Sequence, residues 1–421
     1  MNVLHIAPHL GGGVGKAHAA LAETALGRAD GADPGAVRHR FVLLEPPRDT
    51  HFVDRVRAAG CPVAIAPEPR EMARLVADAD IVQVEWWNHP RLYALLAANA
   101  LPAMRLALWV HISGLAPPLI PARLAELADK VLFTSPCSLK ADNLAAALAA
   151  RPQAFGVVNS GFGFDAPPRP RHAAPKVRIG YLGTLDFIKL HPGFFDMVDA
   201  VTGDIRVSLW GTLDPAGEVA ARAAAMRHPE RVRFEGYASD PRAELGALDL
   251  FLYPLNPQHY GTGENALVEA MSVGAVPLVW DNPAETAIVS HDRNGFVAKS
   301  LQAGAALIER AACNPQRLLR MGAVGARDMA RTHAPAASLR LFARHYAELM
   351  GEPRRHRDFA GPLGTDGRAW FLSTLRPHTD GPEGADTGAS RFFCARAAKG
   401  SLGHFRGCLP DDPSLNALGA A

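Results

Sequence analysis

The sequence predicts two doubly wound α/β domains in tandem, each with a parallel β-sheet, and two observations support this. Short apolar runs alternate with helical patterns almost from the first residue, and strands separated by helices pair in parallel. At residues 166–176 a proline-dense stretch, typical of an extended linker, interrupts the alternation, which then restarts. Ligands of such domains bind beyond the carboxyl ends of the strands, so we expect two facing sheets with a cleft between the domains.

The first predicted domain comprises residues 1–165. Its expected strands are short apolar runs at residues 3–6, 41–44, 63–66, 81–84, 106–110, 131–134 and 155–158. Helical patterns lie between most of them, for example at residues 17–26, 121–128 and 139–149. This order is typical of a sheet whose strands are joined by crossover helices.

The second predicted domain comprises residues 177–335. Its expected strands lie at residues 177–182, 205–210, 232–235, 250–253, 276–280 and 295–298. A closing helix is expected at residues 336–350. In the following tail, residues 351–421, roughly a quarter of the residues are glycine or proline, a low-complexity level. We expect this tail to lack a core of its own, with apolar patches at 370–372 and 392–393 that can dock on the body.

Composition restricts the class of protein. A chain of 421 residues with 48% apolar and 20% charged residues is ordinary for a globular protein of two domains with extensions. A net charge of +2 does not favour nucleic acid as a partner. The cysteines form no C-x-x-C pair, which favours a reducing cytoplasm over a disulfide framework or a zinc site.

No apolar run reaches the roughly 18 residues needed to span a bilayer. Residues 1–6 are typical of a first strand rather than of a signal peptide. We therefore expect a cytoplasmic protein, and a position at the inner face of the membrane is the further option.

Residues 261–279 carry the most specific pattern: a glycine-rich loop, a short helix with two carboxylates, a glycine stop and a buried strand. Thr262 or Gly263 can cap a helix that starts near Glu264, and Gly274 suits its left-handed exit. Backbone N–H groups and a positive helix end then lie where an anion can bind. A phosphorylated ligand with hydroxyl groups, such as a nucleotide sugar, fits this pattern.

The two carboxylates of this helix have different expected roles. Glu264 and Glu269 are five residues apart and do not share one helical face. Glu264 can simply favour the helix dipole. Glu269 lies among apolar residues, where an unpaired carboxylate is costly, so we expect it to bind ligand hydroxyls or, alternatively, an arginine.

A second glycine-rich loop, residues 11–16, follows the first expected strand. Its spacing fits neither a Walker A motif nor a dinucleotide-binding fingerprint, because Lys16 and Ala17 stand at required positions. A strand–loop–helix unit remains, whose N–H groups can approach an anion or a polar ligand closely. A flexible turn without a ligand is the alternative.

Polar and aromatic side chains follow two other expected strands of the first domain. His111 follows residues 106–110, at a place where doubly wound proteins bind ligands, although a structural histidine is the alternative. Trp87 and Asn88 follow residues 81–84. A tryptophan beside polar groups either stacks on a sugar or is buried in the core, and we expect these two residues on the acceptor side.

Two further motifs concern charge. Lys189 follows the first strand of the second domain and can neutralise a diphosphate, although a solvated surface lysine is the alternative. Asp78 and Asp80 form a D-x-D triplet, a pattern that holds a divalent metal in some enzymes. A turn from a helix to a strand explains these aspartates, so we expect no metal there.

Residues 1–350 resemble a retaining glycosyltransferase of family four with the GT-B fold, most strongly at residues 177–298. That family carries E-x7-E followed by A-M-A-x-G-x-P-V-V, and residues 269–279 are similar, with one extra residue before the proline. Residues 159–162 and 249–254 resemble the family's hinge-proximal P-N-G segment and its A-D-x-x-x-x-P strand.

The resemblance implies a role for each matching residue. Glu269 would hold the ribose hydroxyls of the nucleotide, Lys189 the diphosphate, and His111 the donor sugar. The catalytic residues would be His111, Lys189 and Glu264. The donor-binding residues would be Gly12, Gly13, Gly183, Thr184, Lys189, Gly261, Thr262, Gly263, Glu264, Asn265, Ala266 and Glu269.

Two departures from the family pattern concern the donor. Gly261 stands where the first glutamate of E-x7-E is expected, and Glu264 is displaced from it by three positions. Thr184 replaces the basic residue that usually follows the glycine of the diphosphate loop. Backbone N–H groups of residues 262–265, or Glu264 in a shifted role, would then contact the donor sugar. A different donor sugar, weaker catalysis or an inactive relative would each account for these departures.

The resemblance implies a hexosyltransferase-type enzyme of carbohydrate or glycoconjugate biosynthesis. It would move a sugar from a nucleoside diphosphate donor to an acceptor hydroxyl with retention of configuration. The nucleotide sugar is the co-substrate, and no metal or other cofactor is expected. A glycan, a lipid or a small molecule can be the acceptor, and peripheral contact with a membrane is a further option. A sugar-nucleotide epimerase, a phosphorylase and a non-catalytic binding subunit are the alternatives.

Overall fold

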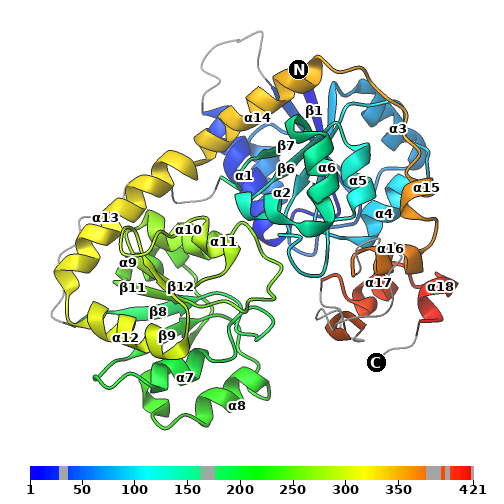
Figure 1. Ribbon diagram of the computed structural model, residues 1–421. Coiled ribbons are helices and arrows are strands. Elements are labelled where there is room, and N and C mark those ends of the chain that lie inside the picture. Colours follow the sequence, from blue (N-terminus) through cyan, green and yellow to red (C-terminus); the bar gives the residue numbers. More distant parts are fainter. Residues whose placement is uncertain (28–36, 162–163, 165–175, 376–389, 394–398, 419–421) are drawn as a thin grey trace. The chain divides into compact units, whose positions relative to one another are not determined.

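The computed structural model describes residues 1–27, 37–161, 164, 176–375, 390–393 and 399–418 (Figure 1). The chain forms two compact units. Unit 1 contains Met1–Gly161, Tyr260–Gly263 and Pro335–Ala421, and unit 2 contains Phe162–His259 and Glu264–Ala334. The predicted linker, residues 166–176, lies outside the described residues except for its last position.

Unit 1 is built on a seven-stranded sheet with the order β3-β2-β1-β4-β5-β6-β7, in which all neighbouring strands are parallel. The strands are β1 (Asn2–Ala7), β2 (Arg38–Leu43), β3 (Val63–Ile65), β4 (Ile81–Trp86), β5 (Leu106–Val110), β6 (Lys130–Phe133) and β7 (Phe155–Val157). Every residue of the central strands β4 and β5 is buried, as expected for a parallel sheet covered on both faces. The predicted doubly wound class is therefore confirmed for this unit.

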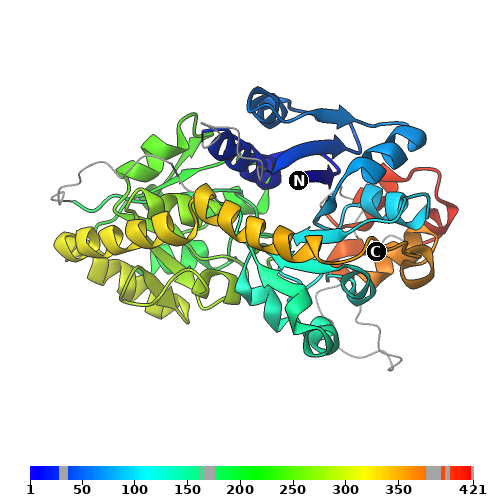
Figure 2. The same ribbon diagram turned by 90° about the horizontal axis from the view of Figure 1, so that it is seen from above.

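The body of unit 1 contains α1 (Gly12–Leu26), α2 (His51–Ala58), α3 (Pro69–Asp78), α4 (Pro90–Ala97), α5 (Ala122–Leu127), α6 (Ala145–Ala150) and α14 (Pro335–Met350). The last of these packs against α1 and β4, and Figure 2 shows it as the long orange helix of this unit. The helix expected at residues 139–149 is broken: two 3₁₀ turns, Pro136–Lys140 and Asp142–Leu144, precede α6. Ala141 interrupts it because its backbone is extended, with ψ 115°.

Unit 2 is built on a six-stranded parallel sheet with the order β10-β9-β8-β11-β12-β13. Its strands are β8 (Ile179–Leu182), β9 (Val207–Trp210), β10 (Val232–Gly236), β11 (Leu250–Tyr253), β12 (Val276–Trp280) and β13 (Phe296–Ala298). Its helices are α7 (Phe194–Asp199), α8 (Glu218–Ala224), α9 (Pro241–Ala247), α10 (Asn265–Ser272), α11 (Pro283–Thr286), α12 (Leu301–Ala312) and α13 (Pro315–Thr332). This sheet confirms the second predicted α/β domain.

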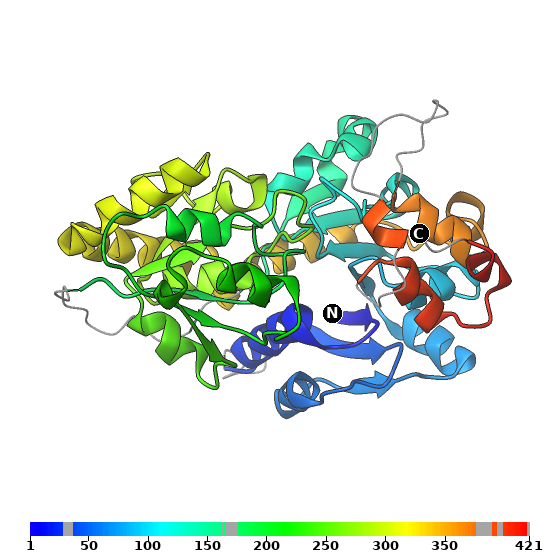
Figure 3. The ribbon, with the colours of Figure 1, turned by 90° about the horizontal axis from the view of Figure 1, so that it is seen from below.

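The tail after α14 contributes short helices to unit 1. They are α15 (Ala360–Leu363), α16 (Gly367–Ser373), α17 (Leu402–Cys408) and α18 (Pro413–Asn416). Both α16 and α17 pack against α4, and Figure 3 shows these orange and red helices beside it. Phe371 and Phe392, from the two apolar patches noted in the sequence, lie in the unit 1 core together with Leu402, Phe405 and Leu415. The tail thus packs on the body of unit 1 despite its low sequence complexity, because a few apolar residues in each short helix are enough to join the core.

None of the helices in the described part of the chain combines the length and apolar character needed to cross a bilayer.

Candidate functional site

Lys189 and Glu264 meet within unit 2. Lys189 lies in the loop after β8, and Glu264 directly precedes α10. The ammonium nitrogen of Lys189 is 3.9 Å from Oε2 of Glu264 and 5.3 Å from the ring centre of Tyr253, the last residue of β11. The carboxyl ends of neighbouring strands β8 and β11 therefore place an accessible cation beside a buried carboxylate, which is the edge where doubly wound sheets bind ligands.

Glu264 is held firmly at this edge. Its side chain is buried; the hydroxyl of Tyr253 donates to Oε2 at 2.8 Å, and Nδ1 of His259 lies 3.5 Å from Oε1. Burial and the negative charge of Glu264 hold the pKa of Tyr253 well above its ordinary value, so the hydroxyl remains a donor. The backbone of Glu264 has φ +20°, an uncommon value for a residue with a side chain. Local packing thus outweighs backbone preference to fix this carboxylate.

The helix start differs from the sequence prediction. Glu264 itself is the N-cap of α10, so neither Thr262 nor Gly263 caps the helix, and no side chain bonds the first turn at the cap. Residue preferences did not predict this N-cap, because Glu264 has a left-handed φ and the start of α10 is shifted by one residue. Gly274 follows the helix with φ +84°, which confirms the predicted left-handed exit.

Glu285 is a member of this cluster that the sequence analysis missed. Its side chain is buried at α11, where the amide of Asn282 donates to Oε1 at 3.1 Å. Burial, and then the negative charge of Glu264, raise the pKa of Glu285 to about 8. The carboxyl group is therefore mostly neutral at pH 7, which reduces the negative charge near Lys189. The Asn-x-x-Glu spacing after β12 resembles a helix capping box and was the available signal.

Two other predicted donor residues have roles of their own in the fold. The N–H group of Gly183 donates to the carbonyl of Trp210 at 3.0 Å, so this group is engaged in the sheet edge. The hydroxyl of Tyr181 donates to the carbonyl of Thr184 at 2.7 Å, and a Cβ at Gly183 would approach that hydroxyl oxygen within 2.7 Å. This loop is consequently fixed by its own unit and needs glycine at its first position.

The remaining predicted donor residues divide between the units. Glu269 is buried on α10, and Asn265 and Ala266 form its first turn. The preceding residues Gly261, Thr262 and Gly263 belong to unit 1, where Thr262 is buried with its hydroxyl 3.8 Å from the sulfur of Cys137. The segment that was predicted as one loop therefore changes unit directly before Glu264.

In unit 1, His111 bonds to a fully buried carboxylate. Nε2 of His111, which follows β5, lies 3.0 Å from Oε2 of Glu85. The other carboxylate oxygen lies 3.1 Å from Nδ1 of His5 and 3.1 Å from Nε2 of His18, and Gln83 donates to it at 2.9 Å. Burial alone would raise the pKa of Glu85, but the charge of His18 and hydrogen bonds from the histidines lower it well below its ordinary value.

This network sets the tautomer of His111. Burial lowers the pKa of His111, so the ring is neutral at pH 7. An ionised carboxylate only accepts hydrogen bonds, so Nε2 of His111 carries the ring proton and donates to Glu85. Nδ1 is then the nitrogen left to accept a hydrogen bond from a ligand hydroxyl.

The first glycine loop leads into α1. Gly12 and Gly13 are exposed in its first turn, and the N-cap, Gly11, makes no side-chain capping bond. Gly12 has φ +55°, and a Cβ there would meet no atom within 4 Å. Conformation rather than crowding requires glycine at this position, and the N–H groups of the first turn are open to a ligand within this unit.

The predicted acceptor residues are buried. Trp87 and Asn88 follow β4, and the amide oxygen of Asn88 accepts a hydrogen bond from Tyr93 at 3.1 Å. Within the described residues, Nε1 of Trp87 and Nδ2 of Asn88 are buried without a hydrogen-bond partner. The tail reaches this loop, since the ammonium group of Lys399 lies 6.0 Å from the ring centre of Trp87.

The D-x-D triplet is explained by the fold, as expected. Asp78 ends α3 and pairs with Arg74 at 3.3 Å on the surface. Asp80 precedes β4 and accepts a hydrogen bond from the N–H of Asn2 at 2.8 Å. Each carboxylate thus has a protein partner next to the turn between α3 and β4.

Comparison with known proteins gives a family for part of the chain and a fold for most of it. Residues 176–314 match the family model of the glycosyl transferases group 1. No curated protein sequence matches the chain. The matched residues include Lys189, Glu264 and Glu285.

Three solved structures illustrate the fold. A glycosyltransferase from Rickettsia africae is 12% identical and covers 84% of this chain and 99% of its own, with a TM-score of 0.63. HepE of Anabaena in complex with UDP is 18% identical and covers 83% of this chain and 100% of its own, with a TM-score of 0.62. The lipopolysaccharide outer core galactosyltransferase WaaB is 16% identical, with coverages of 83% and 99% and a TM-score of 0.61. These comparisons support the glycosyl transferases group 1 family for residues 176–314, in a chain with the two parallel-sheet domains of the GT-B fold.

Proposed function

We propose that this protein is a retaining glycosyltransferase that transfers a sugar from a nucleoside diphosphate donor to an acceptor hydroxyl. The observation that carries the proposal is the cluster of Lys189, Glu264 and Tyr253 at the carboxyl ends of β8 and β11, inside the segment that matches the family model. HepE, which shares the fold, binds UDP and UDP-glucose in its crystal structures.

Unit 2 is proposed to hold the donor. Lys189 would neutralise the diphosphate, together with the N–H groups of Asn265 and Ala266 at the start of α10. Because Glu285 is mostly neutral at pH 7, it adds little negative charge against the bound anion. Glu269 would hold the ribose hydroxyls.

The proposed reaction needs no protein nucleophile. The acceptor oxygen bonds to the anomeric carbon on the side of the leaving group, the bond from that carbon to the diphosphate breaks, and the diphosphate takes the acceptor proton. The protein then acts mainly by stabilising the charge that grows on the departing diphosphate. Lys189 and the first turn of α10 would do this, with no metal taking part.

Unit 1 is proposed to contribute His111 and the acceptor loop. Nδ1 of His111 can accept a hydrogen bond from a sugar hydroxyl because Glu85 holds the proton on Nε2. The buried polar atoms of Trp87 and Asn88 that lack partners can serve acceptor hydroxyls once a ligand enters. Glycans, lipids and small alcohols all carry such hydroxyls.

The decisive test is Lys189→Ala. We expect kcat to fall on the order of 10²-fold or more, the scale seen when one stabiliser of a developing negative charge is removed. Lys176→Ala is the matched control, because Lys176 is an exposed lysine of the same unit that pairs with Asp204 at 2.7 Å. Sugar transfer is measured with uridine, guanosine and adenosine diphosphate sugars. Unchanged donor affinity and turnover in both Lys189→Ala and Glu269→Ala would show that the site is misplaced.

A non-catalytic binding subunit is the second candidate, favoured by Gly261 at the position of the family's first glutamate. Binding of nucleotide sugars without turnover, for every donor and acceptor tried, would support it. An epimerase would instead change the donor's sugar without an acceptor, which product analysis detects.

A further inference from the structure

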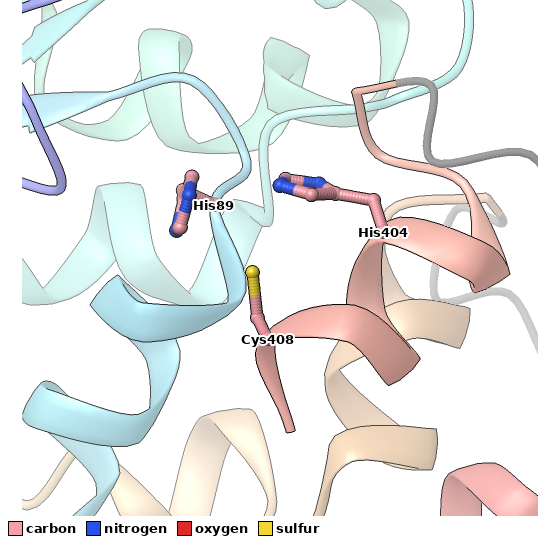
Figure 4. A group of neighbouring side chains, drawn as sticks. All are labelled: His89, His404 and Cys408. Atoms are coloured by element: carbon pink, nitrogen blue, oxygen red, sulfur yellow. The ribbon is translucent and has the colours of Figure 1, made fainter. Parts of the chain in front are cut away.

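Three metal-binding side chains meet where tail helix α17 packs on the start of α4. His404 and Cys408 are one helical turn apart on α17, so they share one face. His89 is the N-cap of α4 and is buried. One ring nitrogen of each histidine and the sulfur of Cys408 all lie within 4.8 Å of one another. Figure 4 shows His404 pointing a ring nitrogen toward His89, with the sulfur directed at the space between the rings.

We propose that His89, His404 and Cys408 bind a zinc ion. Imidazole nitrogen and thiolate sulfur are the ligands that zinc prefers. In a tetrahedral site the bonds of about 2.0–2.3 Å place neighbouring ligand atoms about 3.5 Å apart, so no pair in the cluster would need to close by more than about an ångström on binding. The proposal does not depend on the glycosyltransferase function.

Glu45 is the fourth ligand in this proposal. Its Oε1 lies 3.6 Å from Nε2 of His89, and Glu45, His89 and His9 form a second group of donors within 4.8 Å of one another. A carboxylate and a thiolate together balance the two charges of the ion. Four ligands, two from α17 and one each from Glu45 and His89, would complete a closed site of the structural kind.

The hydrogen bonds around the cluster identify the ligating nitrogen. Nδ1 of His89 accepts from the N–H of Arg91 at 3.3 Å, and Nδ1 of His404 accepts from that of Gly400 at 3.2 Å. Among the described residues, no hydrogen bond joins His89, His404 and Cys408 to one another. Nε2 is therefore the nitrogen available to the metal in both rings. Binding there moves the ring proton to Nδ1, so these two long contacts must open as the ligands close.

Such a site would join the tail to the loop after β4. His89 follows Trp87 and Asn88 directly, and Lys399 of the tail lies beside Trp87. The zinc would thus hold α17 against α4 and keep the tail over this loop. We expect hydrogen exchange in α17 to slow when zinc is added and to return when the metal is removed by a chelator.

Cobalt serves as the spectroscopic probe for the site. The full-length protein is stripped with a chelator and titrated with Co²⁺, and Zn²⁺ is then added in competition. We expect one cobalt per chain, a thiolate-to-cobalt charge-transfer band in the near ultraviolet, and loss of that band on adding zinc. Cys408→Ser should abolish the band, and His404→Ala should weaken zinc binding by about a hundredfold or more, since even outer partners of ligands are worth 10–100-fold.

Controls come from the same chain. Cys313→Ser removes an exposed cysteine of unit 2, and His51→Ala removes an exposed histidine of unit 1; neither should change cobalt or zinc binding. Cobalt binding without a charge-transfer band, or an equal band in Cys408→Ser, would overturn the proposal. His89→Ala is not decisive because His89 is buried and also caps α4, whereas His404 and Cys408 are only partly buried.

Discussion

Glu285 and Glu264 are two buried carboxyl groups of unit 2 with different surroundings. Tyr253 and His259 surround Glu264, and Lys189 lies 3.9 Å from it. Glu285 is buried and accepts a hydrogen bond from the side-chain amide of Asn282. Burial, and then the negative charge of Glu264, favour the neutral form of Glu285, so its pKa rises to about 8.

Glu285→Gln tests this assignment through pH. Because the folded pKa is about 8 and the ordinary value is 4.5, the folded state holds a proton that the unfolded state loses between these values. The wild-type protein therefore loses stability as pH rises through this window, by at most a few kcal/mol. We expect the melting temperature of Glu285→Gln, relative to wild type, to increase from pH 4.5 to pH 8.

The control for this experiment is Glu218→Gln, because Glu218 is an exposed glutamate of α8 in the same unit. Its difference from wild type should stay constant with pH. A constant difference for Glu285→Gln as well would mean that Glu285 is ionised in the folded protein at neutral pH.

Glu85 is the opposite case, a fully buried carboxylate that stays ionised. We expect Glu85→Gln to destabilise the protein by about 3 kcal/mol or more, because the amide loses the negative charge and replaces one of the two acceptor oxygens with an NH2 group that cannot accept. Urea unfolding measures this loss, and Glu126→Gln, on an exposed side chain, is the control. Nitrogen chemical shifts of His111 should also show a loss of its single tautomer; if they stay the same, Glu85 does not set that tautomer.

Within unit 2, helix α10 packs against α13. A Cβ at Gly322 of α13 would come within 2.1 Å of the carbonyl oxygen of Gly274, the residue that ends α10 in the left-handed conformation. The backbone of α13 therefore packs directly against the C-terminal end of α10. This contact holds the helix that presents Glu264 and Glu269.

Gly322→Ala should consequently destabilise unit 2 by about 1–3 kcal/mol, the cost of overpacking a tight contact. Gly246→Ala is the matched control, because Gly246 lies in α9 and a Cβ there meets nothing within 4 Å. That substitution should be neutral or stabilising by up to about 1 kcal/mol, since alanine favours helix more than glycine. Equal effects of the two substitutions in thermal unfolding would contradict the described packing.

Because the chain divides into two units, hydrogen exchange can show which of them binds a nucleotide. If unit 2 holds the donor, a nucleoside diphosphate should slow hydrogen exchange around Lys189 and α10. At a ligand concentration of 100 times Kd, the stabilisation is about 2.7 kcal/mol. Lys189→Ala should lose this protection, while Lys176→Ala keeps it. Protection confined to Met1–Gly161 would instead place the nucleotide in unit 1.

The sequence by itself determined the two parallel sheets. Fully buried strands such as β5 appear as continuous apolar runs, and the strand ends point to the ligand side, which led to Lys189, Glu264 and His111. These are local signals, because strand periodicity, glycine stops and motif spacing depend only on residues that are close together in the sequence. The roles of these residues in catalysis stay predictions.

Only the tertiary structure decided which side chains meet. Glu285 joins Glu264 because β11 and β12 are neighbours, and His404 and Cys408 reach His89 because the apolar residues of α17 dock on α4. The spacing of the cysteines along the chain is not that of a metal motif, so the sequence predicted no zinc site. Distances between residues remote in sequence depend on how the core packs, and no local pattern records them.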